Sequence, residues 1–155
     1  MTRYGGLTRY GIPLLMLGEG LKLRNVKVDR RVVQGLPAIL GNANQLEQVF
    51  INMIQNSVDA FSDGTEDAMV AVGLDWSEEG TTVKLSFSDN GVGIAPAHLA
   101  RIYEPFFTTK EVGEGTGLGL SIVYGIVADH DGTIECQSEY TKGTTFTITL
   151  PVAGA

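Results

Sequence analysis

NQLEQVFINMIQNSVDA, residues Asn44–Ala60, is the stretch around which the rest of the fold is arranged. Its apolar residues recur at steps of three and four, a spacing typical of the buried face of an amphipathic helix. We therefore predict a helix over Asn44–Phe61, with Asn42 or Asn44 as its N-cap. The apolar face of this helix consists of Leu46, Val49, Phe50, Met53, Ile54, Val58 and Phe61.

The segments on either side of this helix favour strands that come in antiparallel pairs. Helical runs separate these pairs, whereas an all-parallel sheet would alternate strictly with helices. The pattern predicts an α+β two-layer sandwich, with a mostly antiparallel sheet covered on one face by about three helices. Strands are expected over 26–33, 69–76, 82–88, 133–138 and 144–150, and further helices over 96–102 and 118–130.

Length and charge restrict the function classes. The 155 residues suffice for one domain. The formal net charge of −7 argues against a broad basic surface for DNA or RNA. Cys136 is the only cysteine, so no intramolecular disulfide can form, and no apolar run is long enough for a membrane helix.

Two glycine clusters stand out from ordinary turns. Gly91 and Gly93 follow a predicted strand, and a second cluster, Gly113–Gly119, precedes a predicted helix. Glycines let the backbone approach an anion, and a helix start offers N–H groups, so the second cluster resembles a phosphate site; a flexible surface loop is the alternative. Neither the P-loop pattern nor the dinucleotide-binding glycine pattern occurs in the chain.

Asn52 and Asn56 lie four residues apart and share one helix face with Asp59. A solvated polar stripe is one interpretation. The other is that the amide oxygens face a hard cation such as Mg²⁺, which prefers oxygen ligands and often bridges protein to phosphate.

Five blocks, in this order, resemble the ATP-binding catalytic domain of bacterial sensor histidine kinases, within the superfamily of DNA gyrase B, the Hsp90 chaperones and MutL. The resemblance covers about Val26–Pro151 and is strongest to the nitrogen-regulation and oxygen-sensing kinases. It implies the Bergerat fold with a mobile ATP lid. The blocks are NQLEQVFINMIQNSVDA (44–60), DNGVGI (89–94), EPFFTTK (104–110), GEGTGLGLSIVYGIV (113–127) and GTTFTITLP (143–151).

The resemblance implies a role for each matching residue. Asn56 matches the magnesium ligand, Asn52 an asparagine that holds the phosphates, and Asp89 the carboxylate that accepts from the adenine amine. Thr145 is expected to add a hydroxyl or a water-mediated contact near the base. The remaining predicted nucleotide-binding residues are Asp59, Gly91, Gly93, Ile94, Thr109, Lys110, Gly115, Thr116, Gly117, Leu118, Gly119 and Leu120.

Asn52 differs from the ATPases of the superfamily, and two other places in the chain depart from the kinase pattern. Asn52 stands where the ATPases of the superfamily have a glutamate base, so hydrolysis of ATP should be slow. The family often has a Lys or Arg just after the asparagines, but residues 57–60 include none, and Lys110 is our candidate for the cation at the γ-phosphate. Asn42 stands where the family often has Asp, and its N-cap role is retained.

The resemblance also predicts the setting. The γ-phosphate of Mg·ATP would pass to a histidine on a separate dimerisation domain and then to a response regulator. His98 and His130 are not in the setting of that acceptor, so we expect a cytoplasmic fragment, monomeric and without direct membrane contact. Its expected parts are a disordered leader or expression remnant (1–12), a linker (13–25), the catalytic domain (26–151) and a tail (152–155).

Two alternatives remain open. One is a degenerate nucleotide-binding module that works by docking a partner. The other is a stand-alone serine kinase of the anti-sigma type, which shares the fold.

Overall fold

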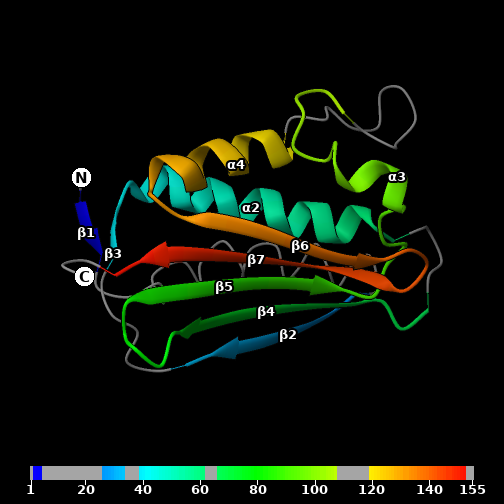
Figure 1. The fold of residues 1–155 in the computed structure, drawn as a ribbon. Helices are drawn as coiled ribbons and strands as arrows, with labels where there is room; N and C mark the ends of the chain where they lie inside the picture. Colours follow the sequence, from blue (N-terminus) through cyan, green and yellow to red (C-terminus); the bar gives the residue numbers. More distant parts are fainter. Residues whose placement is uncertain (1, 5–25, 34–38, 62–65, 108–118, 153–155) are drawn as a thin grey trace.

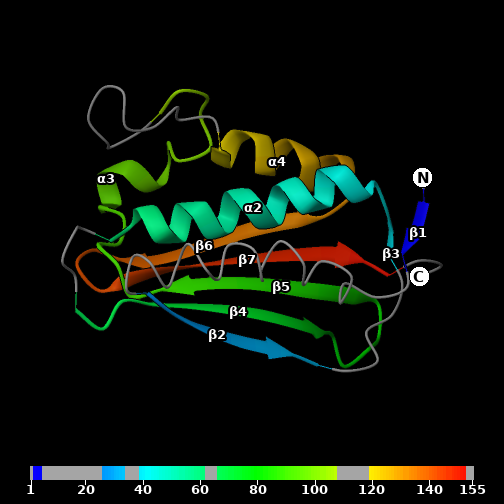
Figure 2. The same cartoon turned by 180° about the vertical axis from the view of Figure 1, so that it is seen from behind.

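The fold consists of a mixed sheet with helices packed on one of its faces. The computed structural model describes residues 2–4, 26–33, 39–61, 66–107 and 119–152. Helices α2 (Ala43–Asp59) and α4 (Gly119–Asp129) pack against each other over the sheet (Figure 1). The view from behind shows both helices on the same face (Figure 2). This arrangement confirms the predicted two-layer α+β fold.

The five-stranded sheet has the order β2–β4–β5–β7–β6. The edge strand β2 runs parallel to β4, and the other neighbouring pairs are antiparallel. The predicted hairpin between β4 and β5 is confirmed. The strands are β2 (Lys27–Val32), β4 (Met69–Trp76), β5 (Thr82–Asp89), β6 (Thr133–Glu139) and β7 (Gly143–Pro151).

Strict alternation along the central strands builds the core. In β5 and β7 every second side chain is buried against the helices, and the intervening side chains, mostly Ser, Thr and Lys, lie on the other face. Phe87 of β5 meets Phe50 of α2 edge to face, with ring centroids 5.6 Å apart. The apolar face of α2 predicted from its spacing is therefore the face that covers the sheet.

The start of α2 is fixed by a side-chain cap. Oδ1 of Asn42 accepts a hydrogen bond from the backbone N–H of Gln45 at 3.1 Å. This identifies Asn42, and not Asn44, as the N-cap. The helix ends at Asp59, two residues before the predicted end at Phe61, because the N–H groups of Ala60 and Phe61 turn back to Ser57 and Val58.

Other elements differ from the prediction at their ends. Helix α3 covers only Pro96–Leu99 and continues as turns, so the predicted helix over 96–102 is too long. A two-stranded sheet pairs β1 (Thr2–Tyr4) with β3 (Ile39–Gly41), although residues 1–12 were expected to be a disordered leader. Neither short strand has an alternation long enough to detect. The predicted linker and most of the predicted lid lie outside the described residues.

Candidate functional site

Asp89 lies at the end of β5, on the face of the sheet that carries the helices. It continues the alternation of Val83, Leu85 and Phe87, so its carboxylate is drawn into a partly buried position. Burial raises the pKa of Asp89 from 3.8 to about 6, although hydrogen bonds from the backbone N–H groups of Gly91 and Thr144 oppose the rise. A partly desolvated carboxylate held by backbone donors is well suited to accept from an amine.

Gly91 brings the loop after β5 against the C-terminal end of α2. A Cβ at Gly91 would lie 2.6 Å from the carbonyl oxygen of Ala60 and 2.7 Å from its Cβ. The backbone N–H of Val92 donates to the same carbonyl oxygen at 2.9 Å. Only glycine allows this contact without displacing the helix end.

Gly93 requires glycine for a different reason. Its φ of +72° lies in the left-handed region, and a Cβ there would collide with the carbonyl oxygen of Glu139. The loop is held to the β6–β7 hairpin by the N–H of Thr141, which donates to the carbonyl oxygen of Val92 at 2.6 Å, and by the N–H of Ile94, which donates to Oγ of Ser138 at 2.7 Å. The predicted residues Asp89, Gly91, Gly93 and Ile94 are thus brought together.

On α2, the two predicted asparagines have different surroundings. Oδ1 of Asn52 accepts from Nε2 of Gln48 at 2.7 Å, and its Nδ2 donates to the carbonyl oxygen of Gly119 at 3.4 Å. The half-buried amide of Asn56 makes no hydrogen bond with any residue that the structure describes. Asp59 accepts from Nε2 of Gln55 at 2.9 Å. Asn56 is therefore the amide with its oxygen available to a ligand.

The helix start predicted to face phosphate is placed beside Asn52. Gly119 is the first residue of α4, and both Gly119 and Leu120 are half-buried there. The remaining lid residues predicted for the site lie outside the described residues. They are Thr109, Lys110, Gly115, Thr116, Gly117 and Leu118.

Thr145 and Asp89 belong to opposite faces of the sheet. Thr145 is paired with Ser88, their hydroxyl oxygens are 2.8 Å apart, and both belong to the face of the sheet away from the helices. Thr144 is the residue opposite Asp89, and it is buried on the helix-bearing face. The signal in the sequence was the alternation of β7, in which Thr144 shares the face of Phe146.

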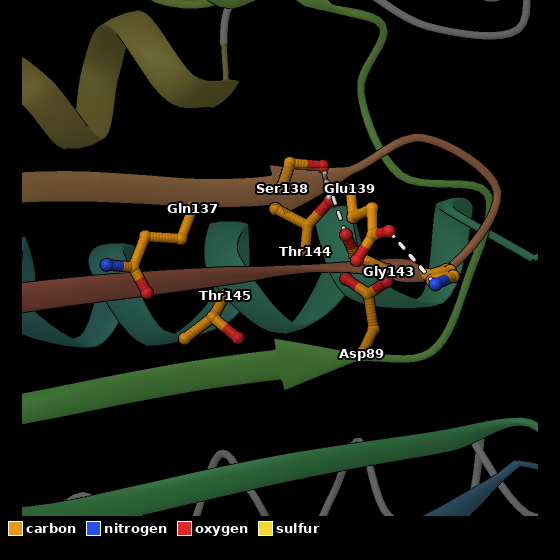
Figure 3. Close-up of a pocket in the computed structure, with 8 residues that line it drawn as sticks. Asp89, Gln137, Ser138, Glu139, Gly143, Thr144 and Thr145 are labelled. Carbon is orange, nitrogen blue, oxygen red and sulfur yellow. Dashed lines mark hydrogen bonds and ion pairs between the residues drawn. The ribbon is translucent and has the colours of Figure 1, made fainter.

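A cavity of about 400 Å³ lies at the hairpin end of the sheet (Figure 3). Its size is within the range of small-molecule sites. Neither Asn52 nor Asn56 lines the cavity. Of the predicted site residues that the structure describes, only Asp89 at the end of β5 and Thr145 near the start of β7 line it. The lining residues come from both faces of the sheet and are Asp89, Gln137, Ser138, Glu139, Lys142, Gly143, Thr144 and Thr145.

The oxygen atoms available at the site suit a hard cation that arrives with a ligand better than a metal ion held by the protein alone. No group of three or more His, Cys, Asp or Glu side chains within the described ranges could hold a metal ion. A single amide oxygen from Asn56 matches Mg²⁺, which usually keeps several waters and is shared with substrate phosphates.

Among the described residues, no helix is long and apolar enough to cross a bilayer.

Comparison with known proteins gives a consistent result. Residues 41–154 match the model of the family described as histidine kinase-, DNA gyrase B- and HSP90-like ATPase. Sporulation kinase E of Bacillus subtilis is 40% identical over 137 residues, which cover 88% of this chain and 18% of that protein. Sensory histidine kinase/phosphatase NtrB of Rhizobium meliloti is 34% identical over 141 residues, which cover 84% of this chain and 36% of that protein. The chain therefore spans well under half the length of these relatives.

Solved structures agree on the fold. The catalytic domain of histidine kinase ThkA superposes with a TM-score of 0.82 at 25% identity, covering 97% of this chain and 95% of that domain. Full-length ShkA, solved in complex with AMPPNP, gives a TM-score of 0.79 at 28% identity and covers all of this chain and 32% of ShkA.

Proposed function

The chain belongs to the family of histidine kinase-, DNA gyrase B- and HSP90-like ATPases, and from that premise we propose that it binds Mg·ATP and donates the γ-phosphate to a histidine on a separate dimerisation domain. Its relatives are sensor histidine kinases, so it is the ATPase domain of a two-component kinase. The nitrogen-regulation and oxygen-sensing subgroup is our proposal for the finer assignment, and NtrB is one of several kinds of sensor kinase among the relatives.

One observation carries the proposal: α2 connects the glycine loop after Asp89, which is our proposed base end, to the start of α4, which is our proposed phosphate end. Ala60, just after the helix, contacts the glycine loop that follows Asp89, and Asn52 contacts the first residue of α4. Eight residues separate these contacts, about 12 Å at 1.5 Å per residue. A nucleotide of two or three phosphates needs a span of this order, and Asn56 lies halfway along it.

The roles follow from this placement. The ionised Asp89 carboxylate accepts from the exocyclic amine of the base, and the glycine loop allows the backbone to pass close to it. The start of α4 presents N–H groups with a positive dipole end to the phosphates. The amide oxygen of Asn56 would hold Mg²⁺, which supplies charge neutralisation on the phosphates when bound.

Phosphoryl transfer at such a site depends on positioning rather than on a protein base. In the transfer step, the bond between the γ-phosphorus and its bridging oxygen breaks, ADP leaves, and a phosphorus–nitrogen bond forms on the incoming histidine. Asn52 cannot take a proton from water at neutral pH, so the competing hydrolysis stays slow. Lys110 remains our candidate cation for the γ-phosphate.

The wider setting is also proposed. The acceptor histidine and the dimer contacts would be supplied by another part of the kinase, so the 155-residue chain should be a cytoplasmic monomer that passes phosphate towards a response regulator. His98 and His130 are not acceptors in this scheme. His98 packs its ring against Phe107, and His130 is buried.

The experiment is phosphoryl transfer in trans. The chain is incubated with γ-labelled Mg·ATP and a separately made dimerisation domain that carries a histidine. We expect an acid-labile, alkali-stable phosphoprotein whose label sits on the dimerisation domain. Acid-stable label would indicate a serine kinase. No transfer by a chain that still binds nucleotide would indicate a docking module.

A further inference from the structure

Ser138 connects three segments at the base end of the site. Its Oγ lies 2.7 Å from the backbone nitrogen of Ile94, 3.0 Å from the carbonyl oxygen of Gly143 and 2.9 Å from Oγ1 of Thr144. These partners belong to the glycine loop and to the first two residues of β7. The close-up shows Ser138 and Thr144 meeting beside Asp89 (Figure 3).

Only one placement of the hydroxyl protons makes all three contacts hydrogen bonds. A serine hydroxyl has one proton to donate and two lone pairs to accept with. The Ile94 N–H can only donate, so it uses one lone pair, and the Gly143 carbonyl can only accept, so it takes the proton. The distance between the Ser138 and Thr144 hydroxyl oxygens allows either one to donate, and in this placement the Thr144 hydroxyl donates to the second lone pair of Ser138.

With its proton on Ser138, the Thr144 hydroxyl can only accept a hydrogen bond from a ligand. Once its single proton points to Ser138, Oγ1 of Thr144 has only lone pairs left to offer a ligand. Thr144 is paired with Asp89 across β7 and β5, so the two side chains lie on the same face as direct neighbours. The ionised carboxylate of Asp89 is also an acceptor. The base end of the site thus presents two acceptors side by side and no side-chain donor from this pair.

We propose that Ser138 is the positioning residue that sets the base preference of the site, by holding the Thr144 hydroxyl as an acceptor next to Asp89. The inference rests on the proposed nucleotide-binding function and adds a specificity determinant to it. An amino-purine offers the two protons of its exocyclic amine, directly or through a water. An oxo-purine turns an acceptor oxygen towards two acceptors and leaves all of them unmatched, which costs binding.

The test is the ratio of affinities for ADP and IDP, measured by titration calorimetry with Mg²⁺ on the 155-residue chain. The two nucleotides differ only in the base edge that this pair reads, so the ratio does not respond to general loosening of the site. We expect the parent to prefer ADP by about 100-fold or more. In Ser138→Ala the Thr144 hydroxyl can rotate and donate, and the ratio should fall by at least about tenfold.

Two further comparisons control the result. Ser138→Thr keeps the hydroxyl and should keep the parent ratio. Thr144→Val removes the second acceptor and should lower the ratio, whereas Thr147→Val, the same change on the opposite face of β7 and outside the cavity, should not. The Thr144 and Thr147 pair keeps the inference testable if Ser138→Ala does not fold.

The inference is overturned if Ser138→Ala or Thr144→Val binds both nucleotides with the parent ratio. A parent that binds ADP and IDP equally also overturns it and leaves the proposed function standing. A folded parent that binds neither nucleotide overturns the proposed function itself.

Discussion

The Nε2 atom of His130 accepts a hydrogen bond from the backbone N–H of Asn42 at 3.0 Å, across 88 positions of sequence. The Asn42 N–H can only donate, so Nε2 carries no proton, and Nδ1 is left to donate to the carbonyl oxygen of Ile126 at 2.8 Å. One neutral, buried ring therefore joins the end of α4 to the N-cap of α2. Helix α4 carries Gly119 and α2 carries Asn56. The ring therefore helps to fix the position of these two residues relative to each other, although it does not lie in the site.

Replacing His130 should destabilise the fold. His130→Ala leaves the Asn42 N–H and the Ile126 carbonyl group without partners and opens a cavity, and we expect the free energy of unfolding to fall by about 2–4 kcal/mol. Urea denaturation followed by circular dichroism measures the change. His98→Ala is the matched control, because His98 is half-buried and has no hydrogen bond from its ring to any described residue, and it should cost less than about 1 kcal/mol. Equal losses for both variants would refute the bridging role.

The space around Gly91 and Gly125 predicts opposite effects on stability when each is replaced by alanine. Gly91→Ala forces a Cβ against the end of α2 and should lower stability by about 1–3 kcal/mol and weaken nucleotide binding. Gly125→Ala places a Cβ in open space within α4 and should raise stability by up to about 1 kcal/mol without affecting binding. Thermal melts with and without ADP measure both. A Gly91→Ala variant with parent stability would show that the close approach is not required.

The raised pKa of Asp89 predicts a pH dependence with a definite sign. In the folded state the Asp89 carboxyl group keeps its proton up to about pH 6, whereas in the unfolded state it loses the proton near pH 3.8. Between these values the folded state binds more protons, so the contribution of Asp89 to stability is full below about pH 3.8 and is lost as the pH rises through 6. In Asp89→Asn this dependence should be absent. The difference in unfolding free energy between parent and variant should therefore shift against the parent from pH 4.5 to pH 7.

The same titration should affect ligand binding in the other direction. Because the ionised carboxylate accepts from the base, the affinity for adenosine should fall as the pH drops below 6, by about tenfold at pH 5 relative to pH 7. Adenosine is used because its lack of phosphates removes their own titration. A flat profile across pH 5–7 would exclude Asp89 as the reader of the base.

The elements whose periodic pattern of apolar residues continues over many residues could be predicted from the sequence. Strands β4, β5 and β7 alternate over eight or nine residues, and α2 repeats its apolar face over four turns, so these elements were placed within two residues. Strands β1 and β3 have three residues each and exist only through their pairing with each other. Helix α3 ended early because nothing in its sequence marks the end of a single turn.

The site was predictable where the local pattern of residue types is distinctive. Asp89, Gly91 and Gly93 lie within five residues of one another, so the sequence already puts them in one segment, and their role in nucleotide binding stays a prediction. The alternation of β7 puts Thr144, and not Thr145, on the same face of the sheet as Asp89, and the expected contact of Thr145 near the base stays a prediction. Ser138 could not be found from the sequence, because its role depends on the register of β6 with β7 and on a loop 44 residues away.

The most direct test of the central claim is a calorimetric titration of the chain with AMPPNP, in Mg²⁺ and in EDTA, for the parent, Asn56→Ala and Asp89→Asn. We predict that Mg²⁺ strengthens binding to the parent at least tenfold, that Asn56→Ala removes this gain, and that Asp89→Asn weakens binding under both conditions. Asn44→Ala, the same change at the exposed start of α2, should behave as the parent. A folded parent that gives no binding heat, or an Asn56→Ala variant that keeps the full gain from Mg²⁺, would contradict the account.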